Sequence, residues 1–292
     1  MTSVLYDAPG PGAKRRNIIY TVVFLAVFAL LAWWVLGIMA EKDQLDADKW
    51  SPFVTDSQVW TTFLLPGLGE TLTAAALSLV IALPLGAILG IGRLSDHAWV
   101  RIPVGVVVEF FRAIPVLIMM VFASQLFVQF TSVDSEVRPL YAVVTGLVLY
   151  NASVIAEIVR AGIQSLPSGQ TDAAKAIGMR KGQMMVSVLL PQAVTAMLPA
   201  LVSQLVVIVK DTALGGAVLG LTELLFQVRT ITANYGANTI AALTVVALLF
   251  ILVNFALTSF AGWLENRLRK GKKSTGAIVD RTAVDAGGAL GG

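Results

Sequence analysis

Pairs of oppositely charged residues lie inside stretches of the chain that are otherwise apolar. The pairs are Glu109 with Arg112, Glu157 with Arg160, and Lys210 with Asp211. Residues three apart share a face of a helix, so the first two pairs can each be partly neutralised. Charged side chains are costly inside a bilayer and indicate function there. An amino acid carries an ammonium and a carboxylate, and a midplane site for it needs both signs of charge or a helix N-terminus.

Neutral polar residues lie close to these pairs and could complete such a site. Asn151 precedes Glu157, Gln204 precedes Asp211 by seven residues, and Thr212 follows it. The candidate substrate pathway therefore consists of Glu109, Arg112, Asn151, Gln204, Lys210, Asp211 and Thr212. Glu157 and Arg160 lie near the inner end of a span, where a structural or interface role is favoured. The sequence does not separate substrate contact from contact between subunits.

Other kinds of chemistry are excluded by composition. The chain has no cysteine and one histidine, His97, so we expect no metal site and no catalytic residues. A G-x-x-x-x-G-K-[ST] phosphate loop is also absent, and we expect no cofactor-binding residues in this chain. The net charge of +3 reports membrane topology rather than a nucleic-acid partner.

The composition places the chain in a membrane. It has 292 residues, of which 57% are hydrophobic and 13% charged, with a mean hydropathy of +0.79. A soluble domain has about 25% charged residues. We therefore predict an all-α, polytopic membrane protein with about six transmembrane helices, each about 20 apolar residues long. The expected spans are 18–39, 70–92, 103–130, 140–162, 194–214 and 239–264, with a glycine-rich, partly re-entrant stretch at 215–238.

Basic residues between the spans indicate the orientation. Residues 1–17 and the tail from Glu265 are rich in lysine and arginine, whereas residues 40–66 carry a net charge of −3. Because basic loops stay in the cytoplasm, we expect both termini and the 163–190 loop to be cytoplasmic. The chain is predicted to lie in the cell membrane, in contact with lipid.

The loop at 165–191 is moderately polar and long enough to need structure of its own. We expect two short helices joined at Gly178. Pro167 and Ser168 favour a helix start, and Asp172 would lie in the first turn, where the helix dipole favours an anion. Small alanines at 173 and 174 leave a shallow face for close packing against another protein.

The spacing of this loop resembles the EAA loop of ABC importer permeases. In that pattern, Glu-Ala-Ala is followed by Gly, Ile and Leu-Pro at fixed spacing. Here the corresponding residues are Asp172, Ala173, Ala174, Gly178, Val188, Leu190 and Pro191. Asp replaces Glu and Val replaces Ile, and both changes keep charge or shape.

Flanking motifs resemble the polar amino acid (histidine, glutamine, glutamate) branch of these permeases. The motifs are FRAIP at 111–115, AEIVRAG at 156–162, SLPSGQ at 165–170 and KDTAL at 210–214. The likeness covers about residues 65–268. With VLYDAPGPG at 4–12, the chain resembles the larger permease of actinobacterial glutamate importers.

The resemblance implies a type I ABC importer permease core with an extra N-terminal helix. The expected divisions are a cytoplasmic segment 1–17, an extra helix with an acidic extracytoplasmic loop 18–66, the core 67–268, and a disordered cytoplasmic tail 269–292. It also implies that the loop couples to an ABC ATPase dimer, which binds ATP and Mg. The further partners implied are a related permease forming a heterodimer and an extracytoplasmic solute-binding protein.

The function that this resemblance implies is a non-enzymatic transport subunit for an acidic or polar amino acid, with glutamate favoured. An ion-gradient-driven secondary transporter, a scaffolding subunit, and a permease of the same family for glutamine or basic amino acids are the alternatives. A secondary transporter would use intramembrane acids such as Glu109 or Glu157. The alanine-rich loop at the EAA spacing argues against the first two alternatives.

Overall fold

The computed structural model describes residues 10–272, and within that range all regular structure is helical. The long helices are α1 (Pro11–Glu41), α4 (Leu65–Arg93), α5 (Ala98–Ala113), α6 (Val116–Phe130), α7 (Arg138–Gln164), α10 (Leu190–Leu219) and α12 (Thr239–Lys272). The shorter ones are α2 (Ala47–Trp50), α3 (Pro52–Thr55), α8 (Ser168–Ala176), α9 (Lys181–Met184), α11 (Leu224–Asn234), and the π-helical segments η1 (Val59–Leu64) and η2 (Met185–Leu189).

Five stretches of the described chain are long and apolar enough to cross a membrane. They are Pro11–Glu41, Val59–Arg93, Arg138–Gln164, Lys181–Leu219 and Thr239–Trp263. The pair α5 and α6 forms a sixth span if it is counted as one. The predicted number of about six is therefore confirmed. Most of these helices extend past the predicted span limits, because a helix can continue beyond the hydrocarbon layer.

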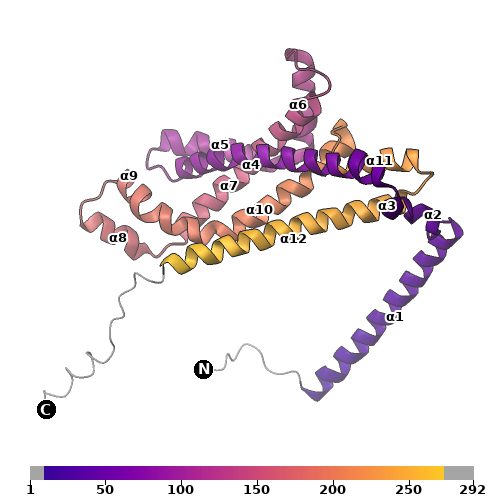
Figure 1. Cartoon of the computed structure of the whole chain (residues 1–292). Coiled ribbons are helices and arrows are strands. Elements are labelled where there is room, and N and C mark those ends of the chain that lie inside the picture. Colours follow the sequence, from indigo (N-terminus) through magenta and orange to yellow (C-terminus); the bar gives the residue numbers. More distant parts are fainter. Residues whose placement is uncertain (1–9, 273–292) are drawn as a thin grey trace.

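The predicted continuous span at 103–130 is wrong. The chain forms α5 and α6, which are bent by 100° at the break between them. Ile114 is extended there, with φ −92° and ψ 131°. Pro115 explains the break, since it lacks a backbone N–H and disfavours helical geometry in the residue before it. In Figure 1, α6 consequently projects away from the rest of the bundle.

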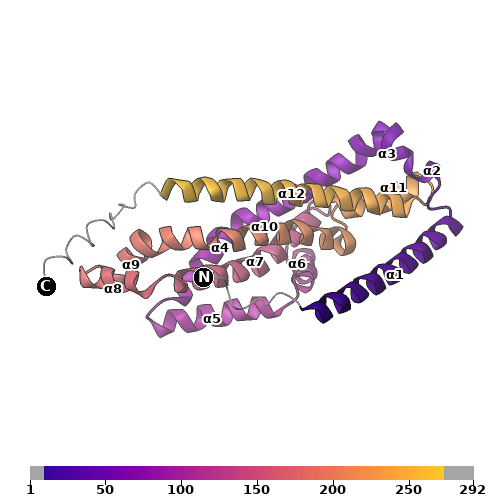
Figure 2. The ribbon, with the colours of Figure 1, turned by 90° about the horizontal axis from the view of Figure 1, so that it is seen from below.

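Helix α7 is the centre of the bundle. It packs against α4, α5, α6 and α10. In Figures 1 and 2, α4, α5 and α10 run beside it, whereas α6 crosses it at a steep angle. Glycines permit the close approach of α4. A Cβ atom on Gly86 would lie 2.6 Å from Cγ2 of Ile155 and 2.8 Å from the carbonyl oxygen of Ala152. Gly86 therefore lies at a close contact between α4 and α7.

We expect Gly86→Ala to destabilise the bundle by about 1–3 kcal/mol, the usual cost of overpacking a tight interface. The measurement is the apparent Tm of the purified protein in detergent. Gly69→Ala is the matched control, because Gly69 lies in the same helix and a Cβ there would meet no atom within 4 Å. Equal Tm values for the two variants would contradict the proposed close contact.

Helix α1 stands apart from the other spans in Figures 1 and 2, and none of its residues is buried. It begins at Pro11 rather than at the predicted Ile18, because Pro at the first helical position favours initiation. At the other terminus, α12 continues to Lys272, so the predicted disordered tail is helical at 269–272. Residues 1–9 and 273–292, which hold the rest of the two predicted terminal segments, lie outside the described range.

The segment between α1 and η1 packs onto the connection between α11 and α12. Lys49 Nζ donates to the carbonyl of Gly236 at 2.5 Å, and the hydroxyl of Tyr235 donates to Asp56 Oδ2 at 2.6 Å. The Tyr235 hydrogen bond lowers the pKa of Asp56, which keeps its carboxylate ionised. These contacts close the end of the bundle that is opposite to α8 and α9 (Figure 1).

Candidate functional site

The 165–191 loop folds as two short helices, α8 and α9, as predicted. Gly178 joins them in a left-handed conformation with φ +77°, which glycine adopts without strain. Its N–H donates to Lys175 O at 2.9 Å, and Met179 N–H donates to Ala174 O at 3.0 Å, so these bonds close the end of α8. Leu190 and Pro191 begin α10 directly after the π-helical segment η2.

The position predicted for Asp172 within the first turn of its helix is wrong. The helix begins at Ser168, so Asp172 is its fifth residue, and the first turn contains no acid. The interaction of the helix dipole with a charge decays within one turn, so this dipole does little for Asp172. Its carboxylate is exposed and available to another molecule.

The adjacent alanines Ala173 and Ala174 differ in burial. Ala174 is buried with 4% of its surface exposed, whereas Ala173 is exposed beside Asp172. Ile177, which the sequence analysis did not single out, is 78% exposed at the end of α8. The outward face of α8 is therefore formed by Asp172, Ala173 and Ile177, and the inward face is anchored by Ala174.

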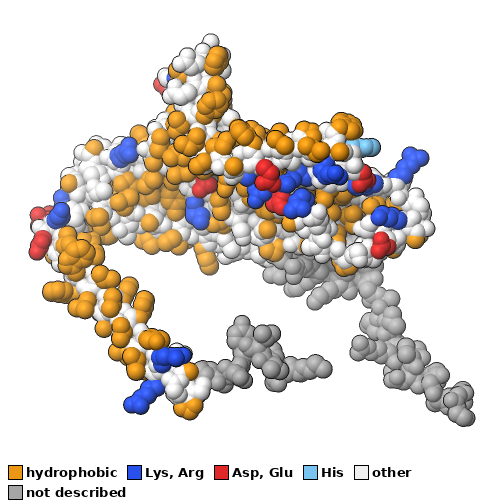
Figure 3. All heavy atoms as spheres, turned by 180° about the vertical axis from the view of Figure 1, so that it is seen from behind, with side chains coloured by type: hydrophobic (Ala, Val, Ile, Leu, Met, Phe, Trp, Pro, Cys, Tyr) orange, Lys and Arg blue, Asp and Glu red, His pale blue; other side chains and the backbone are white. Residues whose placement is uncertain are grey.

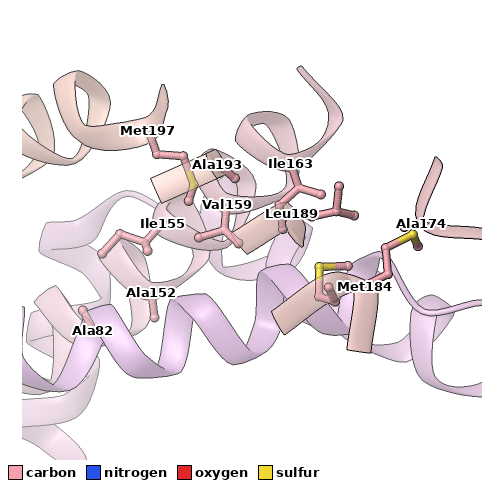
Figure 4. Close-up of a cluster of buried hydrophobic side chains, with 11 residues drawn as sticks. Ala82, Ala152, Ile155, Val159, Ile163, Ala174, Met184, Leu189, Ala193 and Met197 are labelled. Carbon is pink, nitrogen blue, oxygen red and sulfur yellow. The ribbon is translucent and has the colours of Figure 1, made fainter. Parts of the chain in front are cut away.

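Figure 4 shows what Ala174 is anchored to. It belongs to one buried cluster with Met184 of α9, Val159 of α7, Ala193 of α10 and Ala82 of α4. The side chains of this cluster, which we call the coupling cluster, come from two short loop helices and three membrane helices. Because close-packed interiors transmit displacement, the loop and these spans are expected to move together.

Polar contacts also hold the loop. Lys181 Nζ donates to the carbonyl of Leu94 at 2.7 Å and forms an ion pair with Asp96, so α9 is tied to the connection between α4 and α5. The hydrogen bond from Lys181 lowers the pKa of Asp96. The contact is fully formed when the pH is above the ordinary pKa of aspartate. The contact is lost only as the pH falls through the lowered pKa of Asp96. On α8, Gln170 Oε1 accepts from Gln192 Nε2 of α10 at 3.2 Å.

We expect Lys181→Met to detach α9 from the α4–α5 connection. Backbone amides of residues 165–191 should then exchange hydrogen several-fold faster, because local opening becomes easier. Hydrogen exchange measured by mass spectrometry provides the test. Lys175→Met serves as the control, since Lys175 forms no ion pair within the described part of the chain. Unchanged exchange in Lys181→Met would show that the coupling cluster alone holds the loop.

The two charged pairs of α5 and α7 form one cluster, which sequence reasoning treated as separate. Arg93, the last residue of α4, joins them: its Nη2 lies 2.9 Å from Glu109 Oε1 and its Nη1 lies 2.8 Å from Glu157 Oε2. Glu157 also forms an ion pair with Arg160, whose Nε donates hydrogen bonds to both carboxylate oxygens of Glu157. Arg112 lies farther out, with its Nη1 at 3.7 Å from Glu109 and 3.9 Å from Glu157.

Arg93 was missed because it lies one residue beyond the expected span 70–92 and was therefore not considered among the charges inside the spans. Only the packing of α4 against α7 brings it to Glu157. Figure 3 shows the face of the molecule that lies behind the view of Figure 1. On the half of this face toward α8 and α9, Lys or Arg side chains lie beside Asp or Glu side chains. We call Arg93, Glu109, Arg112, Glu157 and Arg160 the charge cluster; it joins α4, α5 and α7.

Among the remaining pathway candidates, Asn151 and Gln204 meet. Gln204 Nε2 donates to Asn151 Oδ1, and Asn151 Nδ2 donates to Leu147 O at 2.7 Å in a fully buried position. Thr212 is also buried, and its hydroxyl donates to Val209 O at 2.8 Å. This hydrogen bond pairs the hydroxyl within its own helix.

Lys210 and Asp211, the third charged pair, are not in direct contact. In the described chain no salt bridge joins them. Adjacent residues of a helix point about 100° apart, which separates their charged groups. Lys210 is exposed and Asp211 is half-buried, so the two side chains meet different surroundings.

A protein-family model matches residues 82–270 of the chain, and its description is "Binding-protein-dependent transport system inner membrane component". The chain belongs to this family. The match includes the coupling loop, the charge cluster and all predicted pathway residues. Helix α1 and the short helices that follow it lie outside the match.

Relatives within the family are amino acid permeases. The chain is 50% identical to the glutamate transport system permease protein GluD of Corynebacterium glutamicum, over 80% of this chain and 85% of that one. It is 27% identical to the inner membrane amino-acid ABC transporter permease protein YhdY of Escherichia coli, over 87% of this chain and 65% of that longer one. A crystal structure of an amino acid ABC transporter with histidines superposes with a TM-score of 0.62 at 25% identity, over 71% of this chain and 95% of that chain.

Family membership confirms the predicted fold class and the predicted kind of protein. The chain is a multi-pass membrane protein and the permease component of an ABC transporter. The individual site residues, and the division of the chain into an extra N-terminal part and a core, remain predictions.

Proposed function

We propose that this chain is the permease subunit of an ATP-driven importer for an acidic amino acid, L-glutamate. The observation that carries the proposal is the 50% identity to GluD, which extends over most of both chains. A specificity for glutamine or for basic amino acids within the same family is the alternative. The secondary transporter and the scaffold are not favoured.

The proposal includes partners. A dimer of ABC ATPase subunits would bind ATP and Mg, a related permease would complete the membrane pathway as a heterodimer, and an extracytoplasmic solute-binding protein would deliver the amino acid. The end of the bundle that carries α8 and α9 would face the cytoplasm, together with both termini. The excess of basic residues in the 163–190 loop and in both terminal segments supports this orientation.

In this proposal the outward face of α8 docks on the ATPase. Asp172, Ala173 and Ile177 would contact it, while Ala174 transmits the displacement through the coupling cluster to α4, α7 and α10. Gly178, Leu190 and Pro191 would fix the directions in which the chain enters and leaves the loop. A rigid-body rotation of the spans would then open the pathway to one side of the membrane or the other.

Within the bilayer, the hydrogen-bonded pair of Asn151 and Gln204 would contribute neutral hydrogen-bonding groups near the pathway. Lys210, Asp211 and Thr212 would lie along the same helix as Gln204, with Lys210 presenting a positive charge. Glu157 and Arg160 would have a structural role, which their hydrogen-bonded ion pair supports.

Reconstitution tests the proposal. Proteoliposomes would contain this permease, the second permease, the ATPase and the binding protein, with ATP and Mg on the ATPase side. We expect labelled L-glutamate uptake that requires ATP hydrolysis and every subunit, and that unlabelled glutamate suppresses more strongly than glutamine or arginine does. Uptake by this chain alone without ATP would overturn the importer, and stronger suppression by arginine would overturn the substrate.

A further inference from the structure

The side chains of the charge cluster differ in how many hydrogen bonds they make to one another. Arg93 and Arg160 donate hydrogen bonds to carboxylates, whereas Arg112 donates none to any residue in the described range. The Arg112 side chain is 37% exposed, and the nearest carboxylate oxygens lie 3.7 and 3.9 Å from its Nη1, beyond hydrogen-bond distance. The Glu109 side chain is 59% exposed, and both of its ion pairs, to Arg93 and to Arg112, use Oε1. Its Oε2 has no partner among residues 10–272.

These two unoccupied groups lie on one open face of α5. Glu109 and Arg112 are one turn apart, and Arg101 and Gly105 continue the same face toward the start of the helix. A Cβ placed on Gly105 would meet no atom within 4 Å, so this face is open at Gly105, and Arg93 of α4 contacts it at Glu109 Oε1. The chain therefore leaves a carboxylate oxygen and a guanidinium side by side, accessible from outside the bundle.

Exposed charges on a membrane helix need water or a partner around them. Ionisable side chains in spans almost always face a bundle interior or a water-filled cavity rather than lipid. The charge cluster holds three arginines and two glutamates, so one positive charge is left over. This excess of positive charge favours a carboxylate, rather than a second cation, beside Arg112.

The head group of an α-amino acid has the matching chemistry. Its carboxylate can accept two parallel hydrogen bonds from a guanidinium, which is the strongest common arrangement of such a pair. Its ammonium can donate to a carboxylate oxygen that has no other partner. Both requirements are met on α5 without breaking the hydrogen bonds that Arg93 makes to Glu109 and Glu157.

We propose that Glu109 and Arg112 form a binding site for the zwitterionic head group of an α-amino acid, with the α-carboxylate on the Arg112 guanidinium and the ammonium on Glu109 Oε2. This inference rests on the proposed transport function and deepens it. The site contacts the part that all α-amino acids share, so it favours this class of substrate without distinguishing their side chains.

The test uses the complete importer in proteoliposomes and the variants Arg112→Gln and Glu109→Gln. We expect the KM for L-glutamate uptake to rise at least about tenfold in each, because each loses a charged contact to substrate. Arg112→Lys keeps the charge but loses the fork and should fall between wild type and Arg112→Gln. Arg101→Gln is the control on the same helix face, and its KM should stay at the wild-type value.

Substrate analogues separate the two contacts. Glutarate lacks the ammonium and 4-aminobutyrate lacks the α-carboxylate, so both should displace labelled L-glutamate only weakly from the wild-type complex of the two permeases and the ATPase, in a binding measurement that does not depend on uptake. The Glu109→Gln variant should discriminate less against glutarate than the wild type does. The Arg112→Gln variant should discriminate less against 4-aminobutyrate than the wild type does. A purely structural role would lower the Tm of the variants without changing this pattern.

The outcomes distinguish the site from the function. Wild-type KM values in both glutamine variants, or analogue competition equal to that of L-glutamate, would overturn the head-group site while leaving the importer intact. If the wild-type complex takes up no α-amino acid in the presence of ATP, the transport function itself is overturned, and the site with it.

Discussion

Replacing Gly178 by valine will abolish most ATP-driven uptake while leaving the spans folded. Gly178 has φ +77°, and a non-glycine residue in this left-handed region costs about 1–2 kcal/mol, with β-branched residues at the upper end. A Cβ atom at this position would meet no neighbouring atom within 4 Å, so the main cost arises from the backbone. The chain is expected to relieve it by turning the end of α8, which moves Asp172 and Ala173 away from the ATPase.

The measurement compares ATP hydrolysis and uptake in the same proteoliposomes. Gly178→Val should lower uptake at least about tenfold, while basal hydrolysis by the ATPase continues. Gly178→Asn should retain much of the uptake, since asparagine tolerates the left-handed region. Gly182→Ala is the control, because Gly182 lies in the same loop within α9 and has open space around it. Normal coupled uptake in Gly178→Val would contradict a coupling role for the loop.

The second large effect is expected from Glu157→Gln. Glu157 is the only carboxylate in the described chain that lies within 4 Å of Arg93, Arg112 and Arg160 together. Neutralising it leaves three arginines with Glu109 as their remaining counter-charge. Because Arg93 and Glu157 are partly buried, with 16% and 25% of their side chains exposed, the cost lies between that of surface and buried pairs, about 1–3 kcal/mol.

The apparent Tm of the purified protein reports this loss, and uptake should fall with it as α5 and α7 separate. Arg93→Gln combined with Glu157→Gln should cost clearly less than the sum of the two single changes, since each single variant leaves an unpaired charge. Asp96→Asn provides a control ion pair at the same end of the molecule, outside the charge cluster. Additive effects of Arg93→Gln and Glu157→Gln would argue against a direct interaction between these residues.

Composition and hydropathy predicted the membrane spans well, because the length of an apolar run depends on the bilayer and not on tertiary contacts. The break between α5 and α6 was missed for a related reason. The helices on both sides of Ile114 and Pro115 are apolar on average, so the run reads as one long span and hydropathy does not mark a boundary at this point. Pro115 was the available signal, since the residue before a proline is biased away from helical geometry.

The coupling loop shows how far spacing can predict a site. Gly178 was placed correctly at the junction of two short helices. Which alanine faces inward was not predictable, because Ala173 and Ala174 have the same local propensity and differ only in what lies behind them. Met184 and Val159 decide it, and they join Ala174 through the tertiary fold alone.

The charge cluster required the fold as well. The spacing of three residues correctly paired Glu109 with Arg112 and Glu157 with Arg160. The role of Arg93 depends on how closely α4 approaches α7, which Gly86 permits. Such a contact between residues 64 positions apart has no local signature.

The coupling cluster has a consequence for genetics. Ala174 of the loop shares one packed core with Ala82 of α4 and Ala193 of α10 (Figure 4). Second-site suppressors of a defective loop should therefore arise within the membrane helices of this same gene, where a change of side-chain volume can restore the fit. Selection for growth on the transported amino acid as nitrogen source would recover them, far in sequence from the original lesion and distinct from suppressors in the ATPase gene.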